Sequence, residues 1–168
     1  QFAAPSPPQV HGWPSIAKGK HTLILAPTGS GKTLAAFLWS IDQLFRQSLA
    51  ADTRGFLKNA DGVHTLYISP LKALNNDIHR NLQSPLRQIN DQARQQSIVA
   101  PEIRVAVRTG DTPPHIRQSM LRKPPHILIT TPESVYLLLT SERGRELFRQ
   151  VQFVVVDEIH SICTNKRG

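Results

Sequence analysis

Short apolar runs alternate with longer polar-and-apolar stretches along this chain of 168 residues. The apolar runs are five or six residues long and lie at His21–Ala26, His64–Ser69, Ile103–Val107, His126–Thr130 and Phe153–Asp157. Most of them are nearly continuous in apolar character, which is typical of strands covered on both faces. They predict a mainly parallel sheet.

Helical periodicity fills the segments between these runs. In Thr33–Leu49 a 3.6-residue apolar pattern is formed by Leu34, Phe37, Leu38, Ile41, Leu44 and Phe45. Further helices are predicted at Leu71–Leu86, Pro113–Leu121 and Pro132–Leu139, the last with proline in its first turn. Strands that alternate with helices predict βαβ units and an α/β fold of three layers, α/β/α, with no domain boundary inside the chain.

Three segments show no clear periodicity. Ala51–Gly62 is polar with two glycines and is expected to be a surface loop. Asn90–Pro101 is rich in Gln and Arg, and either extends a helix or forms a loop. Pro5–Pro8 is expected to be a stiff, extended segment, because proline is excluded from helix interiors.

The amino-acid composition indicates where the protein works more clearly than it indicates its activity. The chain has 20 Lys and Arg against 12 Asp and Glu, a formal charge of +8, which fits either a polyanionic partner or a basic solvated surface. The single cysteine, Cys163, excludes an intrachain disulfide and argues against a cysteine zinc site. No apolar stretch approaches the roughly 20 residues of a membrane span, and the N-terminus has no signal-peptide pattern. We therefore expect a cytoplasmic protein without membrane contact.

A glycine-rich segment, Ala26–Thr33 (APTGSGKT), stands between the first apolar run and the first helical segment. This is the setting of a phosphate-binding loop, apart from alanine at its first position. Gly29 and Gly31 let backbone N–H groups turn toward a phosphate, Lys32 can reach the β- and γ-phosphates, and Thr33 can ligate Mg²⁺. The alternative is a chance glycine turn between strand and helix.

Two carboxylates end the last apolar run, in the segment FVVVDEIH. At the carboxyl end of a parallel strand, Asp157 is placed to hold Mg²⁺ through water, and Glu158 to activate the attacking water. His160 is expected at the floor of the nucleotide site, where it couples ATP to a partner domain. The alternative is that the two residues form a turn or a helix cap, which is common for a lone Asp-Glu pair. This alternative has less support in a sequence that also contains a phosphate-binding loop.

These motifs together resemble the DEAD/DEAH-type helicases of the second helicase superfamily, and most closely the Lhr (large helicase-related) group. The likeness runs from Pro5 to the end of the chain and is carried by five strings: Gly12–Leu38, Tyr67–Leu82 (motif Ia), Arg108–Thr112, Ile129–Leu139 and Asp157–Gly168 (motif II). It implies a P-loop NTPase domain of RecA-like fold, the first of two motor domains.

The resemblance also implies roles for individual residues. ATP would be bound by Gln9, Thr28, Gly29, Ser30, Gly31, Lys32 and Thr33, with Gln9 on the adenine edge. Mg²⁺ would be held by Thr33 and Asp157, and catalysis carried by Glu158, Lys32 and Asp157. One strand's phosphates would lie along Ser69, Pro70, Leu71, Lys72, Thr109, Gly110, Asp111, Thr131, Pro132, Glu133 and Ser134. The alternatives are an ordinary exposed glutamine at position 9 and helix caps at the Ser, Thr and Asp positions, although capping and phosphate contact are compatible.

The implied function is the ATP-driven motor of a helicase that translocates on single-stranded DNA or RNA, a choice that contacts with phosphates leave open. Two departures qualify it: Ser161–Gly168 reads SICTNKRG where the group has an Ala/Gly-rich run, and the chain stops before motif III and the second motor domain. The isolated chain is therefore expected to bind nucleotide weakly and hydrolyse it slowly, since an arginine from the second domain is worth about 10³–10⁵ in rate. The alternatives are a binding module without turnover, and another P-loop ATPase such as a transporter or partition motor, against which PLKALNND and TTPES argue.

Overall fold

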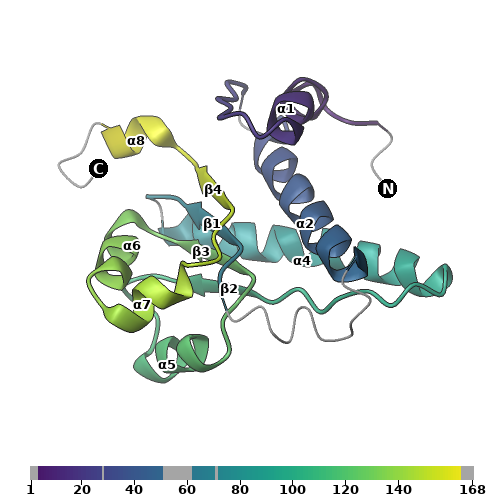
Figure 1. The fold of residues 1–168 in the computed structure, drawn as a ribbon. Coiled ribbons are helices and arrows are strands. Elements are labelled where there is room, and N and C mark those ends of the chain that lie inside the picture. Colours follow the sequence, from purple (N-terminus) through teal and green to yellow (C-terminus); the bar gives the residue numbers. More distant parts are fainter. Residues whose placement is uncertain (1–3, 28, 51–61, 71, 164–168) are drawn as a thin grey trace. The chain divides into compact units, whose positions relative to one another are not determined.

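The protein is described here by a computed structural model, which covers residues 4–27, 29–50, 62–70 and 72–163. The chain divides into two compact units, residues 1–46 and 47–168, and each is described by itself (Figure 1). That one domain spans residues 1–168 stays a prediction.

The first unit contains α1 (Pro7–Ala17) and most of α2 (Lys32–Ala50), whose last residues belong to the second unit. Helix α1 corrects the expected extended segment at Pro5–Pro8, because Pro7 and Pro8 occupy its first turn. Proline is tolerated there since the N–H groups of a first turn have no intrahelical partner. The two helices are joined by the indole of Trp13, which donates to the Ala35 carbonyl at 2.9 Å.

The strand expected at His21–Ala26 is wrong for the structure as described, where this segment has no regular secondary structure. A strand depends on hydrogen bonds from a neighbouring strand, and this segment pairs with none in the described part of the chain.

The second unit is built on a parallel sheet, as the apolar runs predicted. Its strands are β1 (Thr65–Ile68), β2 (Val105–Arg108), β3 (Ile127–Thr130) and β4 (Phe153–Val156). They are ordered β2-β3-β1-β4, and all three pairings are parallel. The four carboxyl ends therefore lie at one edge of the sheet.

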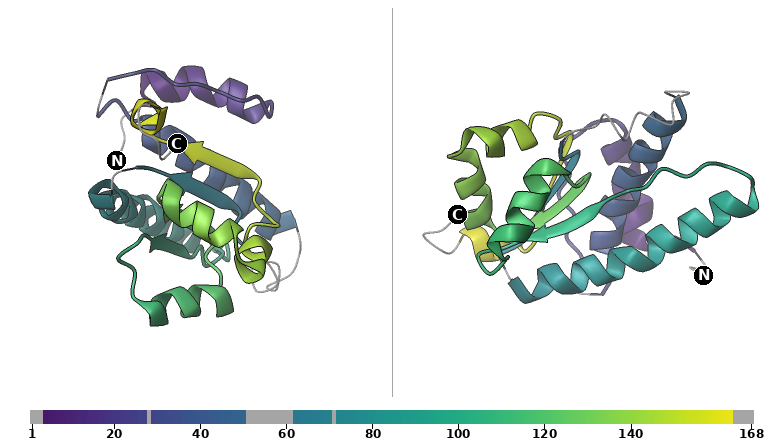
Figure 2. Two further views of the ribbon diagram at one scale, coloured as in Figure 1. Left: turned by 90° about the vertical axis from the view of Figure 1, so that its left-hand side faces the viewer. Right: turned by 90° about the horizontal axis from the view of Figure 1, so that it is seen from below.

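Helices cover both faces of this sheet, which confirms the α/β fold with α/β/α layers (Figures 1 and 2). These helices are α4 (Lys72–Gln95), α5 (Pro114–Arg122), α6 (Pro132–Leu139) and α7 (Glu142–Leu147), while α8 (Ile159–Cys163) follows β4. Helix α4 contacts β2 and β3 on one face, while α5, α6 and α7 lie on the other. The sequence left open whether Asn90–Pro101 extends a helix or forms a loop. In the structure this segment continues helix α4 as far as Gln95. Residues 51–61 of the expected loop lie outside the described residues.

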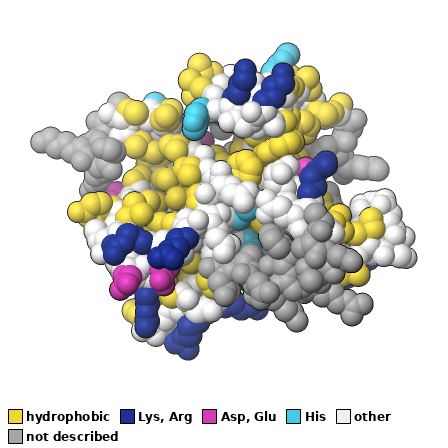
Figure 3. Space-filling view, in the orientation of Figure 1, with side chains coloured by type: hydrophobic (Ala, Val, Ile, Leu, Met, Phe, Trp, Pro, Cys, Tyr) yellow, Lys and Arg dark blue, Asp and Glu magenta, His cyan; other side chains and the backbone are white. Residues whose placement is uncertain are grey.

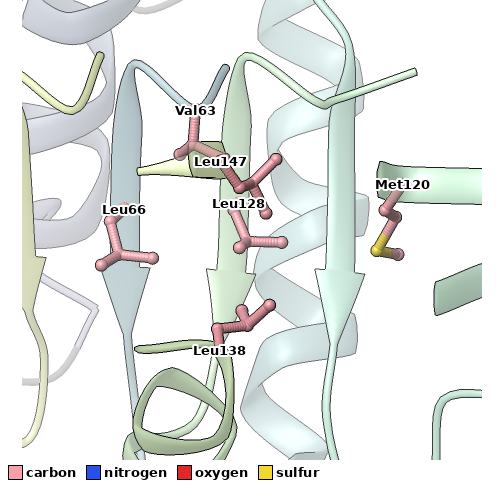
Figure 4. Packing of buried hydrophobic residues seen from close by; sticks show 6 residues of the cluster. All are labelled: Val63, Leu66, Met120, Leu128, Leu138 and Leu147. Atoms are coloured by element: carbon pink, nitrogen blue, oxygen red, sulfur yellow. The ribbon is translucent and has the colours of Figure 1, made fainter. Parts of the chain in front are cut away.

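A close-packed cluster joins the sheet to α5, α6 and α7 (Figure 4). Its buried members are Val63, Leu66, Met120, Leu128, Leu138 and Leu147. Each side chain of this kind contributes about 1.5–3 kcal/mol when fully buried. The cluster fixes β1 and β3, and so also the positions of the residues that follow them.

Strand β4 is one of the two edge strands of the described sheet, and β2 is the other. Its outer side chains are exposed, with Val154 at 56% and Val156 at 44%, and Ile159 of α8 follows at 47%. Apolar side chains gather on the surface in this area of Figure 3. Of the helices that the structure describes, none is long and apolar enough to cross a membrane.

Candidate functional site

The glycine-rich segment adopts the turn that its sequence predicts. Gly29 has φ +78° and Gly31 φ +91°, both in the left-handed region that side chains with a Cβ rarely adopt. Helix α2 begins at the next residue, so Thr33 lies in its first turn. The hydroxyl of Ser30 is buried without a hydrogen-bond partner among the described residues, and Thr28 lies outside them. The turn and its unpaired hydroxyl therefore precede a helix N-terminus, as an anion-binding loop requires.

The ammonium group of Lys32 folds back on the same loop. Nζ donates to the carbonyl oxygen of Ala26 and to that of Pro27, the latter at 2.8 Å. The positive charge is thus held at the loop by neutral acceptors. A phosphate oxygen would be a stronger acceptor for this cation than a carbonyl group.

Helix α1 packs against the glycine turn. A Cβ built on Gly31 would lie 2.8 Å from Ser6 Oγ and 3.2 Å from Gln9 Nε2. The amide oxygen of Gln9 accepts from the Ser6 backbone N–H at 2.9 Å, and Gln9 is only 7% exposed. The alternative of an ordinary exposed glutamine is therefore wrong. The structure brings Gln9 to the phosphate loop, while its contact with adenine stays a prediction.

In the second unit, candidate residues follow each of the four strands at the C-terminal end of the parallel sheet, which is called the carboxyl edge below. Ile68 of β1 pairs with Thr130 and Val156, so Ser69, Thr131 and Asp157 are next to one another on adjacent strands. Two backbone hydrogen bonds fix this alignment, from Ser69 N–H to the carbonyl of Thr130 at 3.0 Å and from Asp157 N–H to the carbonyl of Ile68 at 2.9 Å. The candidate residues therefore lie together at the carboxyl ends of the strands, while their roles stay predictions.

The carboxylate of Asp157 is held on both oxygens. Oδ1 accepts the backbone N–H of Glu158 at 3.0 Å, and Oδ2 accepts the phenol O–H of Tyr67. Tyr67 is fully buried in β1 and was not among the predicted site residues. One signal for it was present in the sequence, since a tyrosine in a buried strand needs a partner for its hydroxyl.

Glu158 has an unusual backbone conformation, with φ +50°. Non-glycine residues adopt this region rarely, at a cost of about 1–2 kcal/mol, and such residues cluster at functional sites. Its carboxylate Oε2 lies 3.3 Å from Nε2 of His160, whose side chain is 74% exposed. The two residues predicted to act in hydrolysis and coupling are therefore in contact.

The segments after β1 and β2 carry the next predicted residues. Ser69 is fully buried, and its hydroxyl has no hydrogen-bond partner in the described part of the chain. Thr109 Oγ1 accepts the Asp111 N–H at 3.3 Å, and Thr112 Oγ1 accepts the Thr109 N–H at 2.9 Å, which closes a tight loop with Gly110 exposed. Pro70 precedes Leu71, which lies outside the described residues, and Lys72 begins α4.

The segment after β3 is a helix cap. Thr131 Oγ1 accepts the Ser134 N–H at 3.4 Å and donates to Ser134 Oγ at 3.2 Å, while Pro132 and Glu133 form the first turn of α6. Thr131 is 2% and Ser134 4% exposed. Capping is thus confirmed for Thr131, which accepts the Ser134 N–H, and contact of either residue with a phosphate stays a prediction.

The two halves of the predicted nucleotide site belong to different units. Lys32 and its loop are in the first, and Asp157 and Glu158 are in the second. In the first half the glycine turn and the helix after it are formed, but the strand predicted before them is not, and in the second half Asp157 and Glu158 follow β4. Their convergence on one magnesium–triphosphate stays a prediction.

Comparison with known proteins places these features in one group. Residues 6–168 match the model of the DEAD/DEAH box helicase family. The chain is 50% identical over 167 residues to the Lhr helicase/probable uracil glycosylase of Mycolicibacterium smegmatis, covering 99% of this chain and 10% of that protein. It is 48% identical over 168 residues to the ATP-dependent helicase Lhr-Core protein 2 of Thermococcus barophilus, covering 100% of this chain and 19% of that protein.

Solved structures agree with the sequence comparison. The Mycobacterium smegmatis helicase Lhr bound to ssDNA and AMP-PNP matches with a TM-score of 0.87 and 49% identity, over 99% of this chain and 20% of that one. The DUF1998 helicase MrfA bound to DNA and AMPPNP matches with a TM-score of 0.64 and 30% identity, over 92% of this chain and 19% of that one. The chain thus spans about a tenth to a fifth of the length of these relatives.

Proposed function

Because this chain belongs to the DEAD/DEAH box helicase family, we propose that it binds ATP with Mg²⁺ and drives a longer Lhr-type helicase along single-stranded nucleic acid. The observation that carries this proposal is the carboxylate of Asp157, held on both oxygens at the edge where candidate residues follow every strand. Membership of this family excludes the alternative of a transporter or partition ATPase.

The residues of the first unit fit a nucleotide. Both glycines of the loop have the positive φ that turns backbone N–H groups toward a phosphate, and Lys32 is already at the loop. The buried, unpartnered Ser30 hydroxyl is a further donor. We propose that Lys32 exchanges the loop carbonyls for β- and γ-phosphate oxygens, and that Gln9, beside Gly31, hydrogen-bonds the adenine edge.

The residues of the second unit fit a magnesium-dependent hydrolysis. Mg²⁺ is usually bound by one or two protein oxygens, waters and substrate phosphates, and we propose Asp157 of this unit as a ligand, together with Thr33 of the first unit. When bound, the ion would neutralise charge on the phosphates. Glu158 would orient and deprotonate the attacking water, and its contact with His160 would connect hydrolysis to the rest of the motor.

The nucleic-acid strand is proposed to lie along the carboxyl edge of the sheet, over the segments that begin at Ser69, Thr109 and Thr131. The unpartnered Ser69 hydroxyl favours this placement because a buried hydroxyl without a partner is costly. Thr131 and Ser134 already bond to each other, so a phosphate at the start of α6 would compete for the two hydroxyls and the Ser134 N–H that form the cap. Contacts of this kind position a strand without reading its sequence.

The proposal is tested on the full-length protein that carries this chain, by measuring ATP hydrolysis with and without single-stranded DNA and RNA. We expect strand-stimulated hydrolysis that Lys32→Ala and Glu158→Gln abolish. The exposed residues Lys20 and Glu102 supply matched controls, and Lys20→Ala and Glu102→Gln should retain it. Salt-sensitive strand binding without stimulated hydrolysis would instead support the binding-module alternative. Absence of both activities would overturn the proposal.

A further inference from the structure

A pocket lies between helices α5 and α7 of the second unit. Its volume is about 670 Å³, within the range of about 300–1,000 Å³ that is usual for ligand pockets. Its apolar floor is formed by Leu121, Pro124 and Leu147, of which Leu147 is only 4% exposed. The rest of the lining consists of exposed polar side chains, namely Gln118 and Arg122 of α5 and Arg143 and Glu146 of α7.

The pocket is at the amino end of the sheet, away from the carboxyl edge. The carbonyl oxygen of Leu147 accepts the N–H of Val63, two residues before β1, at 2.9 Å. Pro124 is three residues before the first residue of β3. A ligand in this pocket would therefore leave Asp157, Ser69 and the rest of the carboxyl edge uncovered.

Basic residues predominate around the pocket. Residues 114–125 and 141–149, which contain α5 and α7, have six Lys and Arg against two Glu, and both kinds of charge gather at the lower left of Figure 3. Arg122 has only a 3.5 Å hydrogen bond to the neutral Gln118. Arg143 has no side-chain hydrogen bond or ion pair with any residue that the structure describes. Two cations beside an apolar floor thus lack a counter-charge.

This combination favours a peptide over a nucleic-acid strand. The carboxylate of Glu146 would repel the closely spaced phosphates of a strand. A peptide can supply carboxylates for the arginines, whose guanidinium groups match them in geometry, and also an apolar side chain for the floor. Apolar contact together with arginine is typical of protein interfaces.

We propose that an acidic segment of the longer helicase docks in this pocket, with carboxylates on Arg122 and Arg143 and an apolar side chain on the floor. The inference rests on the proposed function, because it needs the longer protein. The chain spans about a tenth to a fifth of the length of its relatives, so most of such a protein lies outside it. A segment of the same polypeptide needs few contacts, since its effective concentration can be of the order of millimolar.

The test is photo-cross-linking within the full-length protein. A photoreactive phenylalanine analogue replaces Gln118, which is exposed at the pocket, and mass spectrometry identifies the peptide that it captures. We expect capture of a segment of the same polypeptide in which Asp or Glu residues flank an apolar residue. The matched control has the analogue at Ser119, which is exposed on the same helix but does not line the pocket, and should not capture this segment.

Charge reversal tests the role of the arginines. Arg122→Glu and Arg143→Glu should each lower the yield of the cross-link by about 2–5-fold, the effect expected for loss of an exposed ion pair. Arg149→Glu, at an exposed position outside the pocket lining, should keep the yield. Changing an acidic residue of the captured segment to lysine should restore the yield in Arg143→Glu. A variant that merely folded poorly would not be rescued by a charge change elsewhere in the protein.

Four outcomes overturn the inference. They are equal capture from positions 118 and 119, capture of a segment without acidic residues, cross-links that join two copies of the protein, and capture of an added single-stranded oligonucleotide at position 118. Strand-stimulated ATP hydrolysis of the wild-type protein is measured in parallel. If it is present, each of these outcomes leaves the proposed function intact, whereas its absence contradicts the proposed function itself.

Discussion

The phenol of Tyr67 donates a hydrogen bond to Oδ2 of Asp157, from the strand next to the one that the aspartate follows. Since Tyr67 is fully buried, the donor cannot move without disturbing the sheet. The second oxygen of the carboxylate is held by the Glu158 N–H at 3.0 Å. The orientation of the proposed magnesium ligand is therefore set by a neighbouring strand and by its own backbone.

Replacing Tyr67 with phenylalanine should leave the sheet packed but free one oxygen of Asp157. Groups that orient a metal ligand typically change metal affinity or activity by about 10–100-fold when removed. We expect Tyr67→Phe to raise the Mg²⁺ concentration that half-saturates strand-stimulated ATP hydrolysis by about 10-fold. Tyr136→Phe is the control, because that phenol is on α6 and 69% exposed. An unchanged magnesium dependence in Tyr67→Phe would show that the hydrogen bond is only structural.

We expect Gly31 to matter both for backbone conformation and for the packing of α1 against the loop. A pair of variants distinguishes the two effects. Gly31 has φ +91°, and a Cβ there would lie 2.8 Å from Ser6 Oγ and 3.2 Å from Gln9 Nε2. Gly19 has φ +69° with nothing within 4 Å of such a Cβ. Both Gly→Ala variants should lose about 1–2 kcal/mol of stability to the left-handed backbone. Only Gly31→Ala should also weaken ATP binding, measured by titration calorimetry, and equal affinities would remove the proposed role of the packing between α1 and the loop.

His64 should make the protein less stable in mild acid. Its ring is buried, with Nε2 3.1 Å from the Gln152 amide oxygen and Nδ1 3.0 Å from Thr65 Oγ1. Burial lowers the pKa of His64 below its usual 6.5, and the hydrogen bond to Gln152 opposes this only in part. Between the folded-state pKa and about 6.5 the unfolded chain binds more protons, so stability is full above about pH 6.5 and decreases as the pH falls toward the folded-state pKa.

The measurement is the free energy of unfolding in urea at pH 7.5 and pH 5.5. His64→Gln should be less stable than the wild type at pH 7.5, because a buried ring is removed, but should lose less stability between the two pH values. Contributions from the other histidines cancel in this comparison. Identical losses in the two proteins would contradict the assignment.

Alanine at position 144 should destabilise the protein although it favours helices. A Cβ on Gly144 of α7 would overlap the carbonyl oxygen of Leu138 and lie 2.6 Å from Ser141 Oγ, the cap of the same helix. The overlap should cost about 1–3 kcal/mol net, despite the roughly 1 kcal/mol of helix propensity that alanine offers. Arg143→Ala, at the neighbouring exposed position, should change the unfolding free energy by less than about 0.5 kcal/mol. A neutral or stabilising Gly144→Ala would show that α6 and α7 can separate without cost.

The sequence by itself determined those helices and strands that depend mainly on residues close together in the chain. The prediction of α6 at Pro132–Leu139 is confirmed with the same bounds, because Thr131 caps the helix and proline fixes its first turn. The apolar runs predicted β1, β3 and β4 to within a residue at each end, since continuous burial leaves a continuous apolar pattern. The motif residues followed for the same reason: each motif carries its chemistry within a few consecutive positions.

Only the tertiary structure decided the features that depend on contacts between residues far apart in the sequence. The run His21–Ala26 has the composition of a strand but not its structure, because a strand is made by the chain beside it. Helix α1 and the six-residue α7 were not predicted, since proline and short length hide the helical period. The hydrogen bond between Tyr67 and Asp157 joins residues 90 positions apart. Sequence could therefore propose which residues carry the chemistry, whereas only the packed sheet and helices could decide which side chains hold those residues in place.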